Sequence, residues 1–193
     1  NDLVAIALDS GDIQVLVEGN DFYTSPRLSP DGKTLAWVSW DHPDMPWDNS
    51  QLWIAEIQAD GTLGEKTLVA GGNGESVVEP RWSPGGVLYF SGDRSGYWNL
   101  YRYVEGTAQV VYPAEAEFGY PHWVFGESIL GFIDETTLVC TYNDHGTWKL
   151  ATLNPDRRAL TPIPVPYSSI SDLQVQGEMI AFIGGAATQP TAI

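Results

Sequence analysis

A seven-residue stretch, Pro26-Arg27-Leu28-Ser29-Pro30-Asp31-Gly32, returns further along the chain as Pro80-Arg81-Trp82-Ser83-Pro84-Gly85-Gly86. In both copies proline sets the φ angle of a turn, and glycine permits a positive φ. Each turn is followed by an apolar run with strand character, at 34–40 and at 87–90. Because the turn returns at the same place in the unit, repeats are favoured over a single sandwich or barrel.

Each repeat contains about four short strands, and no segment shows a sustained helical period. Units of roughly 40 to 50 residues with four strands are typical of β-propeller blades. We therefore expect an all-β fold, a propeller fragment of about four four-stranded blades. The expected boundaries are a half-blade at 3–17, blades at 23–70, 77–112 and 121–163, and a half-blade at 169–183. With a half-blade at either end, the expected shape is an open arc.

The composition excludes several classes of partner. Nine Lys and Arg against 25 Asp and Glu give a formal net charge of −16. This charge argues against nucleic acid, whose binding needs cationic side chains, and against docking on anionic lipid. No apolar run approaches the ~20 residues that span a bilayer. The single cysteine, Cys140, excludes an internal disulfide, which fits a reducing, cytoplasmic location; the alternative is a secreted protein without disulfides. We expect no cofactor.

Three longer stretches are more specific than a generic blade. They are Ser39 to Asp48 (SWDHPDMPWD), Ser91 to Tyr101 (SGDRSGYWNLY), and Glu115 to Gly119 with Trp123 to Gly126 (EAEFG, WVFG). Together they resemble the propeller of the prolyl oligopeptidase family of serine peptidases, in its bacterial acylaminoacyl-peptidase or dipeptidyl-aminopeptidase-like members. The resemblance runs from about Leu3 to Gly185, whereas the Ser-Pro-Asp-Gly turns alone also occur in TolB-like propellers.

The resemblance implies a parent with an N-terminal propeller and a C-terminal α/β-hydrolase domain, which carries the Ser-Asp-His triad. The propeller would restrict access to short peptides. The chain has no Gly-x-Ser-x-Gly elbow and no alternating βα pattern, so we expect the hydrolase domain to be absent and the chain itself to catalyse nothing. It also starts at Asn1 without a methionine, as expected for a piece of a longer protein. The alternative function is a stand-alone TolB-like propeller that mediates protein–protein interaction.

Four residues are candidates for contact with a peptide substrate. Glu115 and Glu117 precede an aromatic cluster, and carboxylates beside aromatic rings suit an ammonium group. The alternative is that both are solvated loop acids. Arg94 could reach a substrate carbonyl or carboxylate, or could pair with a neighbouring acid. Trp123 is the fourth candidate.

The insert at 41–50 is expected to form a rim loop, with Asp41, His42 and Trp47 as its marked residues. Its carboxylates and imidazole could hold a divalent cation, but the spacing does not match an EF-hand loop. A polar surface loop stiffened by proline and anchored by tryptophan is favoured, so no metal is expected. The incomplete blades at both ends would leave strand edges unpaired, and this predicts a homodimer of the open arc.

Overall fold

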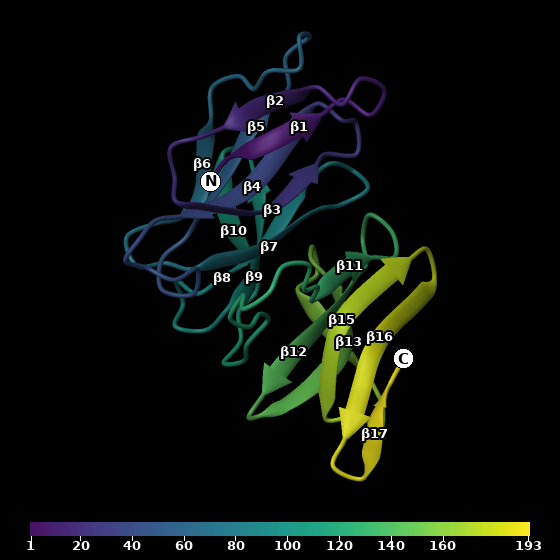
Figure 1. Ribbon diagram of the computed structural model, residues 1–193. Helices are drawn as coiled ribbons and strands as arrows, with labels where there is room; N and C mark the ends of the chain where they lie inside the picture. Colours follow the sequence, from purple (N-terminus) through teal and green to yellow (C-terminus); the bar gives the residue numbers. More distant parts are fainter.

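The computed structural model describes residues 1–193, and every regular element in it is a β-strand. Five antiparallel sheets follow one another in chain order (Figure 1). The strands are β1 (Leu3–Ile6), β2 (Ile13–Val17), β3 (Phe22–Leu28), β4 (Thr34–Trp40), β5 (Gln51–Glu56), β6 (Thr67–Gly71), β7 (Val77–Trp82), β8 (Leu88–Gly92), β9 (Asn99–Val104), β10 (Thr107–Tyr112), β11 (Leu130–Phe132), β12 (Leu138–Asp144), β13 (Thr147–Asn154), β14 (Ala159–Ile163), β15 (Ser169–Gln176), β16 (Met179–Ala186) and β17 (Gln189–Ala192). No helix in the structure has the length and apolar character needed to cross a bilayer.

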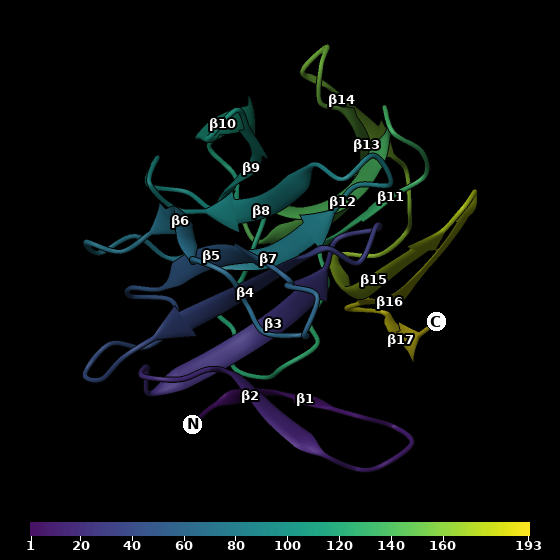
Figure 2. The ribbon, with the colours of Figure 1, turned by 90° about the horizontal axis from the view of Figure 1, so that it is seen from above.

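The sheets are the blades of a propeller. Strands β3–β6, β7–β10 and β11–β14 form three four-stranded blades, flanked by the hairpin β1–β2 and the sheet β15–β17. The first strands of successive blades contact one another, β3 with β7, β7 with β11, and β11 with β15, so these four strands line the inside of the arc. The end sheets share no hydrogen-bonded strand pair, and Figure 2 shows them at opposite ends of an open arc. The expected all-β propeller fragment of about four blades is confirmed.

The blades are stacked face to face, and each gap between them holds an apolar cluster. The largest lies between the second and third blades and includes Leu100, Phe118 and Leu138. A second lies between the first and second blades, around Leu52 and Phe90. Burial on both faces explains why β4 and β8 are apolar at consecutive positions rather than alternating.

The third blade begins later than expected. Its first strand is β11, from Leu130 to Phe132, whereas residues 121–129 are irregular and precede the blade. The apolar residues near Trp123 therefore belong to a connecting segment and not to the third blade. The last sheet also extends further than the expected 169–183, because β17 adds a third strand at Gln189–Ala192.

Three of the four inner strands carry a β-bulge at the same place. The pairing register shifts beside Ser25 in β3, Glu79 in β7 and Asp172 in β15, and all three residues have positive φ angles between 52° and 55°. A bulge redirects a side chain out of the regular alternation of a strand. In β7 it places the Glu79 carboxyl group in a buried site, where only 3% of the residue is exposed.

Candidate functional site

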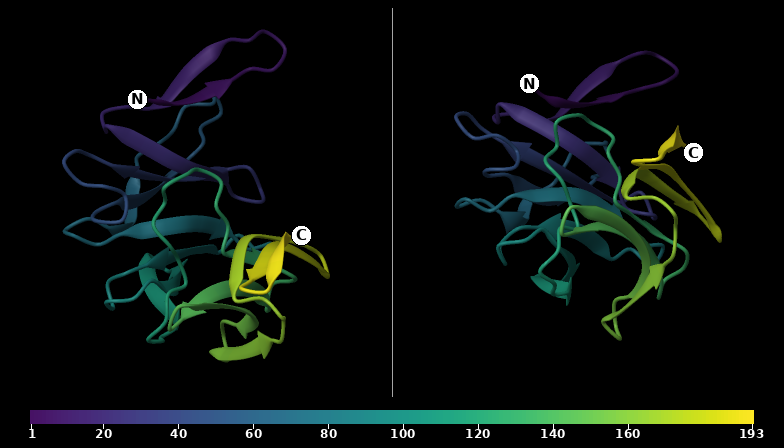
Figure 3. Two further views of the ribbon diagram at one scale, coloured as in Figure 1. Left: turned by 60° about the horizontal axis from the view of Figure 1, so that its bottom comes forward. Right: turned by 90° about the horizontal axis from the view of Figure 1, so that it is seen from below.

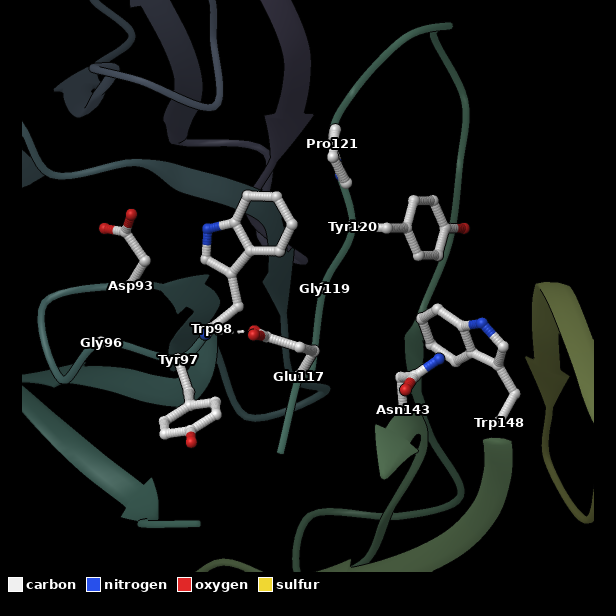
Figure 4. A pocket seen from close by; sticks show the side chains of 10 residues that line it. All are labelled: Asp93, Gly96, Tyr97, Trp98, Glu117, Gly119, Tyr120, Pro121, Asn143 and Trp148. Carbon is white, nitrogen blue, oxygen red and sulfur yellow. Dashed lines mark hydrogen bonds between the residues drawn. The ribbon is translucent and has the colours of Figure 1, made fainter. Parts of the chain in front are cut away.

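A cavity of about 400 Å³ lies between the second and third blades (Figure 4). Three segments form its wall: the β8–β9 loop, the irregular segment between β10 and β11, and the β12–β13 hairpin. The first contributes Asp93 and Trp98, the second Glu117 and Tyr120, and the third Trp148. No lysine, arginine or histidine lines the cavity. Its two carboxylates and its aromatic walls therefore suit a cationic group.

Glu117 is fixed by the backbone around it. Its Oε2 atom accepts a hydrogen bond of 2.8 Å from the Trp98 amide. Its own amide and carbonyl pair with Asn143 at the end of β12, at 3.0 and 2.8 Å. This hydrogen bond orients the Glu117 carboxylate, and no cationic side chain lines the cavity beside it. The remaining lone pairs of its oxygen atoms can therefore accept hydrogen bonds from a ligand.

Asp93 is the second acid of the cavity wall. Its Oδ1 atom accepts a hydrogen bond of 2.7 Å from the Ser76 amide. Burial, opposed by that hydrogen bond and reinforced by the nearby Glu75 charge, raises the pKa of its carboxyl group above the ordinary value. A ligand cation would favour the ionised form of the Asp93 carboxyl group.

Of the four candidate contacts with substrate, only Glu117 lines the cavity. Glu115 is exposed outside it, although it lies only two positions away. The reason is local: the Asn99 side chain exchanges hydrogen bonds with the backbone of Ala114 and Ala116, at 2.8, 3.0 and 3.3 Å. These hydrogen bonds hold residues 114–116 in an irregular conformation rather than in a strand. The rule that residues i and i+2 of a strand share a face therefore does not apply to Glu115 and Glu117.

Arg94 has partners within the chain. Its Nε atom lies 2.8 Å from Glu75 Oε1, and its guanidinium stands 5.0 Å from the centre of the Tyr101 ring. It does not line the cavity. The structure therefore places it in the ion pair that the sequence offered as the alternative to substrate contact.

The rim loop is tied to the connection that precedes β3. Asp41 accepts hydrogen bonds from Asn20 Nδ2 (2.8 Å) and from the Asp21 amide (2.7 Å). The His42 ring packs edge-on against Phe22, at 4.9 Å between centroids. No group of three or more His, Cys, Asp or Glu residues is arranged to hold a metal ion.

Trp47 and Trp123 join the rim loop to the segment between β10 and β11. Their ring centroids are 4.3 Å apart. Trp123 is nevertheless 73% exposed, as are large parts of Val124 and Phe125 beside it. Two of the sequence-predicted residues therefore meet each other, at the surface and outside the cavity.

A buried ionic cluster was missed by the sequence reasoning. Its centre is Glu79, whose Oε2 atom lies 3.6 Å from Arg81 Nε and whose Oε1 atom lies 3.8 Å from His122 Nε2. Arg81 also donates a hydrogen bond of 2.8 Å to Ser128 Oγ. Burial raises the pKa of Glu79, against the lowering effect of Arg81 and Arg27. The repeated Pro-Arg step in the sequence indicated only the two arginines of this cluster, since it places Arg27 on β3 and Arg81 on β7.

Comparison with known proteins gives a consistent set of relatives. The chain is similar to the structure of a puromycin-hydrolyzing peptidase of Mycobacterium tuberculosis, with 35% identity, a TM-score of 0.88, and coverage of 95% of this chain and 28% of that one. A puromycin hydrolase structure matches with 30% identity and a TM-score of 0.84, over 93% of this chain and 28% of that one. No protein-family model matches.

Among curated proteins, dipeptidyl-peptidase 5 of Porphyromonas gingivalis is 28% identical over 112 residues, which are 57% of this chain and 16% of that protein. A prolyl endopeptidase (16% identity, TM-score 0.63) and TolB of Acinetobacter baumannii (15%, 0.56) share the fold. The chain thus spans less than a third of the length of these peptidases. Over nearly its whole length the chain is thus homologous to a propeller region of peptidases of the prolyl oligopeptidase type.

Proposed function

We propose that this chain is the non-catalytic, substrate-gating part of a serine peptidase that hydrolyses short peptides, of the acylaminoacyl-peptidase or dipeptidyl-aminopeptidase type. Its partner would be a C-terminal α/β-hydrolase domain of the same protein. The likeness to two puromycin-hydrolysing enzymes supports a substrate with a small aminoacyl amide. The lower identity to TolB gives less support to a stand-alone interaction propeller. The cytoplasmic location stays a prediction.

The cavity at Glu117 carries this proposal. It holds two carboxylates and no cationic side chain, and Trp98, Tyr120 and Trp148 supply aromatic faces. The free amino group of a peptide or an aminoacyl amide is a primary ammonium, which such a site binds by charge-assisted hydrogen bonds and cation–π contact. We therefore assign recognition of the substrate amino terminus to Glu117 rather than to Glu115.

Glu117→Gln in the full-length protein is expected to lower kcat/KM for substrates with a free amino group by roughly 10- to 100-fold, the worth of a hydrogen bond to a charged group. The glutamine oxygen can still accept the Trp98 amide, so the segment keeps its place. Hydrolysis of puromycin and of an aminoacyl p-nitroanilide would measure the effect. N-acetylated substrates should be affected little.

The matched control is Glu115→Gln, which removes an equal charge two positions away from an exposed site. It should leave kcat/KM within about twofold, because exposed charges interact weakly. Equal losses in the two variants, or an equal loss with acetylated substrates, would contradict the role of Glu117. A full-length protein that is not labelled by a fluorophosphonate probe would contradict the serine peptidase itself.

We also propose that residues 1–193 on their own form a homodimer. The hairpin β1–β2 exposes Val4, Ile6 and Ile13 by 40 to 69%, and β1 pairs only with β2. Unpaired edges beside apolar faces favour association. Sedimentation at micromolar concentration should therefore show a dimer, and a monomer would overturn this expectation.

A further inference from the structure

The inner strands of the first two blades carry the same Pro-Arg step at equivalent positions. In β7 the bulge places Glu79 two residues before Arg81, and Glu79 Oε2 lies 3.6 Å from Arg81 Nε. In β3 the bulge falls at the same step of the pairing, but Ser25 stands two residues before Arg27 where β7 has the acid. The φ angles of Ser25 and Glu79 are 52° and 55°, so the two backbones match. The repeat therefore gives β3 the arginine of this pair without its carboxylate.

Arg27 has no acidic partner elsewhere in the chain. Three other cationic side chains are partly buried, and each forms an ion pair: Arg81, Arg102 and Lys149. Arg27 is also partly buried and forms none, since its side chain donates only one hydrogen bond, of 3.1 Å, to the Pro26 carbonyl. Its Nε atom is shielded from solvent and has no hydrogen-bond partner. Because removing a charge from water is costly unless an opposite charge pairs with it, this guanidinium favours an anion.

A cavity of about 250 Å³ lies at Arg27, between β3 and the segment that joins β10 to β11. Figure 3 shows this teal-green segment as a long loop whose tip reaches back toward the purple and blue blades. The wall of the cavity consists of residues 23–27 with Phe125 and Gly126. Arg27 is the only charged residue among them, and Ser25 contributes a hydroxyl group. The cavity thus offers a cation and a hydrogen-bond donor, and no carboxylate in its wall would repel an anion.

The charges around Arg27 are positive rather than negative in their combined effect. Burial and the positive charge of Arg81 lower the pKa of the Arg27 guanidinium, and the negative charge of Glu79 opposes them less strongly. A guanidinium stays charged at neutral pH even so. Since the chain as a whole has a net charge of −16, this local excess of positive charge distinguishes the cavity from the rest of the molecule.

We propose that Arg27 binds a carboxylate group, in the place that the Glu79 side chain takes beside Arg81. The planar guanidinium matches the geometry of a carboxylate. We assign the carboxylate to the C-terminus of a short peptide, an assignment that rests on the proposed peptidase function. The segment between β10 and β11 contributes Glu117 to the cavity assigned to the substrate ammonium and Phe125 to the cavity at Arg27. A short peptide carries these two opposite charges at its two ends.

N-acetyl-glycylglycine and its C-terminal amide are probes that differ only in the carboxylate. Neither has an amino group, so the cavity at Glu117 does not contribute to the comparison. Titration of the isotope-labelled chain, followed by NMR at the amides of Ser25 and Gly126, should show the carboxylate probe binding about tenfold more tightly than the amide. Arg27→Gln should reduce this ratio to nearly one.

Ser25→Glu tests the equivalence of the two inner strands. A glutamate there would supply Arg27 with a carboxylate from the same strand, as Glu79 does for Arg81, and position 25 already has the backbone conformation of Glu79. This variant should therefore lose the preference for the carboxylate probe although Arg27 is still present. It also tests the site if Arg27→Gln does not fold.

Arg157→Gln is the matched control, because it removes the same charge from an exposed site between β13 and β14. It should leave the ratio of the two affinities within about twofold. Equal binding of the two probes by the wild-type chain, or an undiminished preference in Arg27→Gln or Ser25→Glu, would overturn the site.

The same titration of the full-length protein identifies the source of the carboxylate. Preference for the carboxylate probe in the full-length protein would support the peptide. Preference in the chain alone would mean that an acid from another part of the parent protein occupies the cavity, and it would overturn the peptide assignment. No catalysis is measured, so a failure of the proposed peptidase function would leave these binding results unchanged.

Discussion

Phe118→Ala is expected to lower the free energy of unfolding by about 3–5 kcal/mol, the usual cost of removing a buried phenylalanine ring. The Phe118 side chain is fully buried in the largest apolar cluster, between the second and third blades. Its ring stacks on Tyr142 at 5.1 Å and meets Tyr112 edge-on at 6.2 Å. The thermal midpoint should fall by roughly 10 °C, measured by calorimetry or circular dichroism.

Phe125→Ala is the matched control, since it deletes the same ring from the same segment between β10 and β11. Phe125 is 77% exposed, so its loss should change stability by no more than about 0.5 kcal/mol. A small effect at Phe118 would mean that the segment between β10 and β11 does not close the gap between the two blades. Equal effects at the two positions would mean that Phe125 is buried in solution.

Gly71→Ala is expected to cost about 3 kcal/mol or more, for two reasons that add. Gly71 has a φ angle of +90°, which an L-residue adopts only with strain. A Cβ atom there would also collide with the Ser50 carbonyl oxygen and come within 2.8 Å of Val77 Cγ2. Neither neighbour can move freely, because the Ser50 carbonyl accepts the Gly72 amide at 2.8 Å and the Val77 side chain is fully buried. Urea denaturation of the purified chain would measure the loss.

Gly74→Ala separates the two reasons. Gly74 lies three positions further on with a similar φ angle of +81°, but a Cβ atom there would meet nothing within 4 Å. This variant should therefore lose only about 1 kcal/mol, from backbone strain alone. Equal losses in the two glycine variants would show that close packing at the β5–β6 edge contributes nothing.

Local sequence determined the blades themselves. Apolar runs over 34–40 and 87–90, bounded by Pro/Gly turns, predicted strands, and β4 and β8 occupy nearly those residues. The expected positive φ angle at Gly32 is present, at 69°. Such features depend on neighbours a few residues away, so a short window of sequence contains the information. A short window of sequence was misleading at 121–123, where residues of the segment between β10 and β11 resemble the start of a strand.

The candidate site depends on residues that are distant in the chain, and only the tertiary structure brings them together. Glu117 was predicted because of the aromatic residues near it, but its cavity is completed by Asp93 and by Trp148 from different blades. Glu79 and His122 gave no local signal of their own, because an isolated acid or histidine in sequence is usually solvated. Burial between β7 and the segment that joins β10 to β11 removes Glu79 and His122 from water, and this loss of solvation raises the pKa of the Glu79 carboxyl group and lowers that of the His122 imidazole. The sequence alone therefore determined the repeat and its strands, while the approach of the blades to one another decided which side chains are buried, which are paired, and which can bind.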